Sequence, residues 1–255
     1  MISVVIPTYN RADDLFNCLT SLVDQTFKSF EVIVIDDGST DGTSRVCKQF
    51  SSDLSLKYIL LPQCSGGPAF PRNIGISNSS FNWIAFLDSD DIWSSNKLLK
   101  IVNEIELNPD VQLLFHKFKG IESKYIIKPI FLLDQLFRSG NIIVNSSVVV
   151  SKIILAELNG FDTNSKLISA EDYDLWIRIA FKTDKFKYID EVLGTYTYTV
   201  DSISLNYGRK LTNFLFLFKK HKRIYFSNIL YLVVFVRTII KHSLLYIKQW
   251  YEKLY

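Results

Sequence analysis

Three carboxylates lie within four positions directly after a short apolar run. The run from Trp83 to Leu87 is too short for a helix and has polar neighbours, so it predicts a buried strand. Asp88, Asp90 and Asp91 follow it, and their like charges repel unless a cation or hydrogen-bond donors compensate them. Hard carboxylate oxygens suit Mg²⁺ or Mn²⁺, so one prediction is a divalent metal site. The alternative is an acidic turn that caps the next helix.

A second group of acids opens a segment with helical spacing much later in the chain. Glu171, Asp172 and Asp174 precede apolar residues that include Leu175 and Trp176. Carboxylates in the first turn of a helix are favoured by the helix dipole. The pattern therefore predicts a helix that presents acids at its N-terminal end.

A loop rich in glycine and proline lies between the two acid groups. Gly66, Gly67 and Pro68 precede a helix-like stretch that holds Arg72. Because a glycine-rich backbone can approach an anion and arginine supplies positive charge, the loop is predicted to contact a phosphate. A plain connecting loop is the alternative.

Alternating strand-like and helix-like segments would position these groups. The alternation predicts βαβ units and a mostly parallel α/β sheet, in which ligands bind at the carboxyl ends of the strands. Polar residues follow three expected strands, at 7–11, 36–39 and 88–91, so we expect them at one edge of the sheet. The expected strands are 3–7, 30–36, 57–61, 83–87, 111–115 and 142–150, and the expected helices are 13–25, 40–50, 97–107 and one starting near 171.

Composition describes an ordinary globular protein. Hydrophobic residues make up 48% and charged residues 22% of the 255 positions, which excludes disordered and fibrous classes. Three widely spaced cysteines indicate neither a disulfide framework nor a metal cluster, and they fit a reducing compartment. The first residues lack the pattern of a secretory signal, so the expected location is intracellular.

The C-terminal tail differs from the body in charge. Residues 205–255 hold ten Lys and Arg against one acid, whereas residues 1–204 hold nineteen against twenty-five acids. The uncharged run 224–236 is shorter than the ~20 residues that cross a bilayer. A helix or helix pair lying on an anionic membrane is predicted, and a helical hairpin packed on the body or on a second subunit is the alternative. The aliphatic density of the tail argues against nucleic-acid binding.

Five motifs occur in the order seen in the inverting glycosyltransferases of family 2, which this chain resembles over about residues 1–205. They are Pro7-Thr8-Tyr9-Asn10-Arg11, Ile35-Asp36-Asp37-Gly38-Ser39-Thr40-Asp41, Gly66-Gly67-Pro68 with Arg72-Asn73-Ile74-Gly75, Leu87-Asp88-Ser89-Asp90-Asp91 and Glu171-Asp172-Tyr173-Asp174-Leu175-Trp176. The resemblance implies a GT-A fold, Rossmann-like, with a nucleotide-sugar-binding half (1–107) and an acceptor-binding half (108–205). Residues 206–255 would form a basic, amphipathic helical tail.

The resemblance also implies roles for individual residues. Tyr9 would stack on the nucleotide base, Asp37 would accept a hydrogen bond from it, and Arg72 would support the base or the diphosphate. Asp172 would be the general base, with Glu171 as the second candidate. Asp90, together with Asp88, would hold Mn²⁺ or Mg²⁺. The full set of expected substrate contacts is Pro7, Tyr9, Asn10, Arg11, Asp37, Gly67, Arg72, Asp88, Asp91 and Trp176.

One motif departs from the family pattern. Many relatives end the catalytic domain with Tyr-Arg-x-His-x-x-Ser-x-Ser, whereas this chain has Thr197 and Thr199 in place of the arginine and the histidine. Metal binding is therefore expected to rest on Asp90 and the diphosphate alone. The scattered histidines, His116, His221 and His242, are expected to be structural.

The resemblance implies transfer of a hexose or N-acetylhexosamine from a UDP-sugar to a saccharide or a lipid-linked saccharide. Such a reaction is expected in the cytoplasm, peripherally at the inner face of the cell membrane. A nucleotidyltransferase is a weaker alternative, because residues 7–10 are not the glycine-rich loop that it needs after the first strand. A non-catalytic binding module with the same fold would be expected to lose the acids at Glu171 and Asp172, which are present.

Overall fold

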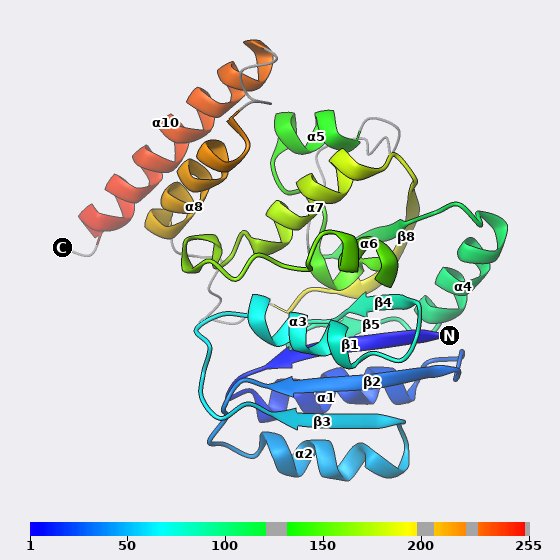
Figure 1. Ribbon diagram of the computed structural model, residues 1–255. Helices are drawn as coiled ribbons and strands as arrows, with labels where there is room; N and C mark the ends of the chain where they lie inside the picture. Colours follow the sequence, from blue (N-terminus) through cyan, green and yellow to red (C-terminus); the bar gives the residue numbers. More distant parts are fainter. Residues whose placement is uncertain (121–131, 198–206, 223–228, 253–255) are drawn as a thin grey trace.

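The computed structural model describes residues 1–120, 132–197, 207–222 and 229–252 (Figure 1). Within these ranges the chain forms an eight-stranded sheet of order β3-β2-β1-β4-β7-β6-β8-β5. The strands are β1 (Ile2–Thr8), β2 (Phe30–Asp36), β3 (Leu56–Leu60), β4 (Trp83–Phe86), β5 (Ile92–Trp93), β6 (Leu113–Lys119), β7 (Val149–Ser151) and β8 (Phe186–Thr195). The helices are α1 (Ala12–Val23), α2 (Thr43–Gln49), α3 (Ala69–Asn78), α4 (Lys97–Leu107), α5 (Leu132–Ser139), α6 (Lys152–Glu157), α7 (Glu171–Lys182), α8 (Tyr207–Lys220) and α10 (Ile229–Glu252).

The first four strands confirm the predicted parallel sheet. Strand β1 pairs in parallel with β2 and β4, and β2 pairs in parallel with β3. Strand β7 then joins antiparallel to β4, and this places the second half of the chain in the same sheet. The α/β fold class is therefore confirmed. All three strands β1, β2 and β3 run toward the same edge (Figure 1).

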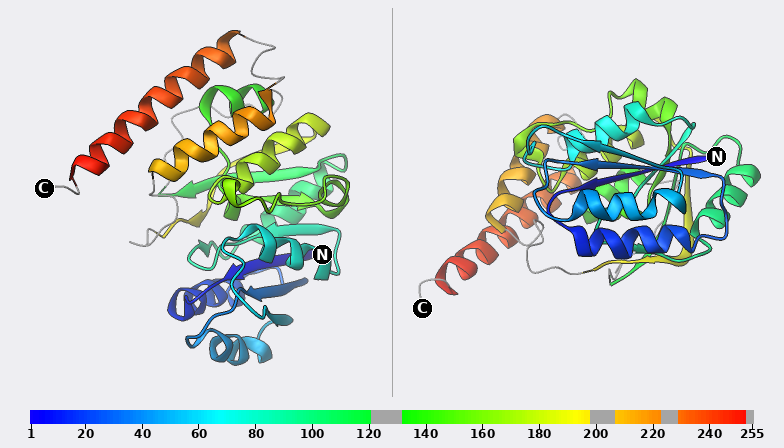
Figure 2. Two further views of the ribbon diagram at one scale, coloured as in Figure 1. Left: turned by 60° about the vertical axis from the view of Figure 1, so that its left-hand side comes forward. Right: turned by 90° about the horizontal axis from the view of Figure 1, so that it is seen from below.

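Helices cover both faces of the sheet because the strands alternate their buried side chains. Val4 and Ile6 pack with α1, α2 and α4, whereas Val5 faces the opposite core with α3, α5, α6 and α7. In Figure 2 the blue helices α1 and α2 lie on one side of the sheet and green helices on the other. Helix α3 lies very close to β1, since a Cβ at Gly75 would meet Val5 Cγ1 at 2.3 Å. Nearer the start of the same helix, Arg72 donates to Asp88, which follows β4.

One expected strand was largely wrong. Residues 142–150 were predicted as a strand, but a short 3₁₀ turn occupies Asn145–Ser147 and only Val149–Ser151 pairs in the sheet. The side chains of that turn are buried, and they bond polar groups at the end of β4 rather than a neighbouring strand. The segment is apolar and buried as a strand would be, but most of its backbone does not pair with a neighbouring strand. The strand β8 and the helices α5 and α6 were not predicted.

The tail forms a helical hairpin that packs on the body. Helices α8 and α10 lie side by side in both views, and the rings of Phe218 and Phe235 stack with centroids 3.7 Å apart (Figures 1 and 2). Leu217 and Phe235 are buried in the core that α7 shares, and Tyr231 Oη donates to Asp134 of α5 (2.8 Å). Packing on the body, which was the alternative, is thus what the described part of the tail shows. No helix within the described ranges combines the length and apolarity needed to cross a membrane.

Candidate active site

The ends of β1 and β2 are tied together by the residues that follow them. Asn10 lies in the left-handed region (φ 49°), its N–H donates to Ser39 Oγ (2.8 Å), and its side-chain oxygen accepts from the Thr40 N–H (2.8 Å). Tyr9 is 46% exposed beside this junction. An exposed ring at the edge of a sheet offers a face on which a planar base can stack.

Asp37 holds the glycine-rich loop against the strand ends. Its carboxylate accepts from the Ser65 N–H (2.9 Å) and from Ser65 Oγ (2.9 Å), and the Ser65 hydroxyl also lies 3.0 Å from the Gly67 carbonyl oxygen. Asp37 and Gly67, two expected substrate contacts, therefore lie in one connected turn. Pro7, another expected contact, is buried within β1.

The acidic end of β4 is not a helix cap. Strand β5 (Ile92–Trp93) follows the acids, and α4 begins only at Lys97 without a side-chain cap. The carboxylates instead bond groups from distant segments. Asp90 pairs with Arg11 of the first strand end at 2.6 Å, and Asp88 accepts from Asn145 Nδ2 at 3.1 Å. The structure thus brings together the expected contacts from the first and the fourth strand.

Arg72 connects the two groups of acids. Its guanidinium donates to Asp88 Oδ1 and to Glu171 Oε1, both at 2.7 Å, and the residue is 3% exposed. Arg72 was expected to support the base or the diphosphate. In the structure its guanidinium fixes the start of α7 against the end of β4, and the contact with the nucleotide stays a prediction.

Ionisation of the carboxylates at the end of β4 is unfavourable, because they are buried and lie close to one another. Burial and the neighbouring Asp88 raise the pKa of Asp91 to about 8, and the same two causes raise the pKa of Asp90 despite its pairing with Arg11. Lys97, which was not predicted as a site residue, is buried nearby. Its Nζ donates to the Ser146 carbonyl (2.8 Å) and lies 3.2 Å from the centroid of the Trp93 ring. Nothing in the pattern of α4 distinguishes this lysine from a surface one.

These oxygens fit a divalent cation. Asp88 and Asp90 are hard ligands in a site with unbalanced negative charge, which is the donor chemistry that Mg²⁺ and Mn²⁺ prefer. Within the described ranges no three His, Cys, Asp or Glu side chains gather closely enough to hold an ion by themselves. Thr199, which takes the place of a histidine in many relatives, lies outside the described residues.

Asp172 is half-buried at the start of α7 and is held in one orientation. Asn141 Nδ2 donates to its Oδ2 (2.9 Å), and the Tyr173 N–H donates to its Oδ1 (2.7 Å). Burial, followed by repulsion from Glu171, raises its pKa above the ordinary value, although Arg72 acts in the opposite direction. A carboxyl group with a raised pKa is better matched to taking a proton near neutral pH. Asn141 had no signal in the sequence.

Glu171 lines a cavity between α3 and the segment before α7. One of its oxygens accepts from Arg72, whereas Oε2 is buried without a hydrogen-bond partner in the described chain. The cavity opens to solvent and is lined by Ser65, Gly67, Pro68, Ala69, Phe70, Asp162, Thr163, Asn164, Ser165, Ile168 and Glu171. A buried acceptor of this kind suits a hydroxyl or amide donor of a ligand.

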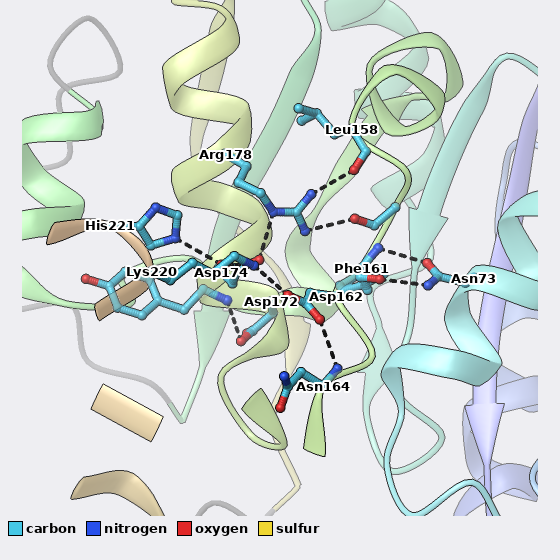
Figure 3. Close-up of polar contacts among 12 residues, drawn as sticks. Asn73, Leu158, Phe161, Asp162, Asn164, Asp172, Asp174, Arg178, Lys220 and His221 are labelled. Atoms are coloured by element: carbon cyan, nitrogen blue, oxygen red, sulfur yellow. Dashed lines mark hydrogen bonds and ion pairs between the residues drawn. The ribbon is translucent and has the colours of Figure 1, made fainter. Parts of the chain in front are cut away.

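Asp174 lies two residues after Asp172 but has a different environment (Figure 3). It is fully buried and pairs with Arg178 (2.7 Å) of α7 and with Lys220 (2.8 Å) and His221 (2.9 Å) at the end of α8. Burial alone would raise its pKa, but these partners lower it to about 2. Asp174 is therefore structural, as is His221, and it fastens the hairpin to α7.

Trp176 is a core residue. It was expected to contact substrate, but its side chain is 0% exposed and packs between Phe86 and Phe161 at centroid distances of 6.5 and 6.4 Å. The apolar spacing of α7 turns this face of the helix inward, so the aromatic residue of the motif supports the sheet. The prediction that Trp176 contacts substrate is therefore wrong.

The fold and the site define a class of protein. A mostly parallel sheet with an exposed tyrosine, a paired acidic strand end and an acid-headed helix at its carboxyl edge is typical of proteins that bind nucleotides. Residues 3–147 match the profile described as "Glycosyl transferase family 2". The chain belongs to this family.

Relatives in sequence agree with this assignment. An "Uncharacterized glycosyltransferase" of Rickettsia felis is 35% identical over 71% of this chain, although the match spans only 30% of that protein. The chain therefore covers less than a third of such relatives. The Escherichia coli protein "UDP-Glc:alpha-D-GlcNAc-diphosphoundecaprenol beta-1,3-glucosyltransferase WfaP" is 28% identical, with 83% of this chain and 82% of that protein covered.

Solved structures share the fold. Staphylococcus aureus TarS 1–349 in complex with UDP-GlcNAc superimposes with a TM-score of 0.70 at 24% identity, covering 84% of this chain and 65% of that one. A mannosyltransferase from Pyrobaculum calidifontis in complex with GDP-Man and Mn²⁺ gives a TM-score of 0.67 at 18% identity, covering 100% of this chain and 80% of that one.

Proposed function

We propose that the chain is an inverting glycosyltransferase that moves a hexose or N-acetylhexosamine from a UDP-sugar to a hydroxyl group of a lipid-linked oligosaccharide or polysaccharide. The observation that supports the proposal is the connection from Asp88 through Arg72 to Glu171, because the proposed base Asp172 directly follows Glu171 in the chain. UDP and UDP-GlcNAc are the ligands named for the S. aureus structures, and a diphosphoundecaprenol acceptor is named for the E. coli relative. Because that acceptor is lipid-linked, we also propose that this chain works in the cytoplasm, peripherally at the inner face of the cell membrane.

Each described residue has a chemical task in this proposal. Tyr9 supports the nucleotide base, and Asp37 holds the glycine-rich loop beside it. Asp172 takes the proton of the acceptor hydroxyl as the new glycosidic bond forms on the face opposite the leaving UDP. Asp90 and Asp88 would hold Mn²⁺ or Mg²⁺, and the chemistry that the ion supplies there is neutralisation of the charge that grows on the diphosphate.

Arg11 and Asn10 support this arrangement from the first strand end. Arg11 pairs with Asp90 at 2.6 Å, so it limits the repulsion among the acids before a donor binds. Asp91 lies behind them, 1% exposed, and accepts from the Thr197 N–H at 3.4 Å. We assign Asp91 a positioning task rather than a direct contact with the donor.

Thermal unfolding with different nucleotides tests the donor class and the metal together. A ligand that binds only the folded chain raises the melting temperature, so UDP with Mn²⁺ should raise it more than CTP, ATP or Mn²⁺ alone. Asp90→Ala should remove the part of the UDP effect that depends on Mn²⁺, whereas the exposed Asp110→Ala should leave it unchanged. Equal stabilisation by ATP and UDP would contradict the proposed donor.

A further inference from the structure

Helix α10 carries a row of exposed aliphatic side chains along one face. They recur every three or four positions and are 48% to 62% exposed, and together we call them the α10 stripe: Val233, Val236, Ile240, Leu244 and Ile247. The face turned toward the body holds Leu232, Phe235 and Ile239, which pack against the core. Helix α10 therefore has two apolar faces, and only one of them is covered by the described chain.

The charges beside the stripe are positive. Arg237 and Lys241 are exposed and each follows a stripe residue directly in sequence, and the helix contains no acid before Glu252. Aliphatic side chains beside cations are the combination that binds an anionic lipid surface, through burial of apolar area and attraction to the headgroups. A second copy of the chain would bring like charges together across the stripe, so charge complementarity disfavours it.

The hairpin is held in a fixed relation to the catalytic helix. Lys220 pairs with both Asp162 (2.6 Å) and Asp174 (2.8 Å), and His221 adds a third contact to Asp174 (Figure 3). In Figure 1 the C-terminal end of α10 projects on the same side as the edge toward which β1, β2 and β3 run. The end of α10 and the carboxyl ends of these strands therefore lie on one side of the molecule.

We propose that the α10 stripe rests on an anionic lipid surface, with Arg237 and Lys241 at the headgroups, and that the Asp174 pairs orient the site toward acceptors in that surface. The orienting role rests on the proposed function, whereas the lipid contact does not. The helix lies on the surface and does not cross it.

Co-sedimentation of the full chain with vesicles tests the contact. Vesicles of phosphatidylcholine mixed with phosphatidylglycerol should bind the chain, and vesicles of phosphatidylcholine alone should bind it more weakly. Val236→Glu with Ile240→Glu should lower partitioning roughly tenfold or more, because two aliphatic groups that would be buried in the lipid are replaced by carboxylates. The matched control is Leu107→Glu with Ile153→Glu, which alters two exposed aliphatic residues elsewhere and should bind as the unaltered chain does.

Arg237→Gln with Lys241→Gln provides an independent variant that keeps the stripe. It should bind anionic vesicles several-fold less and should lose most of the sensitivity to added salt. If the stripe variant and its control partition alike, the proposal is wrong. It is also wrong if the stripe variant turns a dimer into a monomer in light scattering while vesicle binding stays the same.

A separate measurement distinguishes this proposal from the proposed function. Stabilisation by UDP with Mn²⁺ should be equal in the stripe variant, the charge variant and the unaltered chain. A chain that binds vesicles through the stripe but is not stabilised by UDP would overturn the proposed function and leave the lipid contact standing.

Discussion

Asp172 and Asp174 lie in the same turn of α7, yet their environments differ completely. Asp174 pairs with the cations of Arg178 and Lys220, also contacts the His221 ring, and has a pKa lowered to about 2. Asp172 has only amide donors to its oxygens and a pKa raised by burial and by Glu171. A buried carboxylate that is paired with cations stabilises the fold. A carboxylate without a cationic partner keeps a raised pKa and can take up a proton during catalysis.

The largest effect should come from Asp172→Asn. If Asp172 is the general base, transfer should slow by roughly a hundredfold to ten-thousandfold. Binding of UDP, measured by thermal stabilisation, should change little because the hydrogen bonds of Asp172 go to Asn141 and Tyr173, and neither is an expected nucleotide or metal contact. The variant keeps the size of the side chain, so its own stability should not fall.

Glu171→Gln is the control that separates the two acids of the motif. If this change abolishes transfer while Asp172→Asn retains near-normal turnover, the general base is Glu171. The different environments of Asp172 and Asp174 would then say nothing about catalysis.

The next largest effect should be on stability, from Asp174→Asn. The change removes a buried carboxylate whose partners, Arg178 and Lys220, are partly exposed, and we expect a loss of about 2 kcal/mol in the free energy of unfolding because hydrogen bonds to a charged group are lost. Urea unfolding measures it. Turnover per folded molecule should fall only a few-fold. The exposed Asp190→Asn, which also breaks a pair with lysine, should cost much less.

The sequence predicted the parallel half of the sheet well. Strands β1, β2 and β4 are short apolar runs with polar ends, and their side chains alternate between two cores as period-two burial requires. The acids at the end of β4 were found for the same reason, since charge directly after a buried strand stands out. Neither inference needs knowledge of distant contacts.

The residues that were missed depend on such contacts. Lys97, Asn145 and Asn141 have ordinary local surroundings in sequence, and only the fold brings them to Ser146, Asp88 and Asp172. Trp176 was misassigned because a motif position was taken as a ligand contact, whereas burial on α7 decides its role. Pairing across more than thirty positions leaves no periodic signal.

Stability should depend on pH with opposite sign at the two aspartates. The folded pKa of Asp174 lies below its unfolded value of 3.8, so its contribution is complete above that value and is lost as the pH falls toward about 2. The folded pKa of Asp172 is raised, so its contribution is present at low pH and is lost as the pH rises through the folded pKa. Urea unfolding across pH should therefore show Asp172→Asn gaining stability relative to the unaltered chain as the pH rises. A parallel pH dependence in both would contradict the unbalanced environment of Asp172.

The smallest effect on turnover should come from Asn141→Ala, which tests the environment of Asp172 alone. Asn141 donates to Asp172 Oδ2 and thereby lowers its pKa and fixes its orientation. Without that donor, the acidic limb of the pH–rate profile should move to higher pH, and turnover at neutral pH should fall roughly tenfold, as expected for the loss of one hydrogen bond to a charged group. Glu171→Gln removes a like charge and should move the same limb to lower pH. Opposite movements in the two variants require that the titrating group is Asp172, because Asp174 contacts neither side chain. If both variants leave the limb in place, another group controls the pH dependence of transfer.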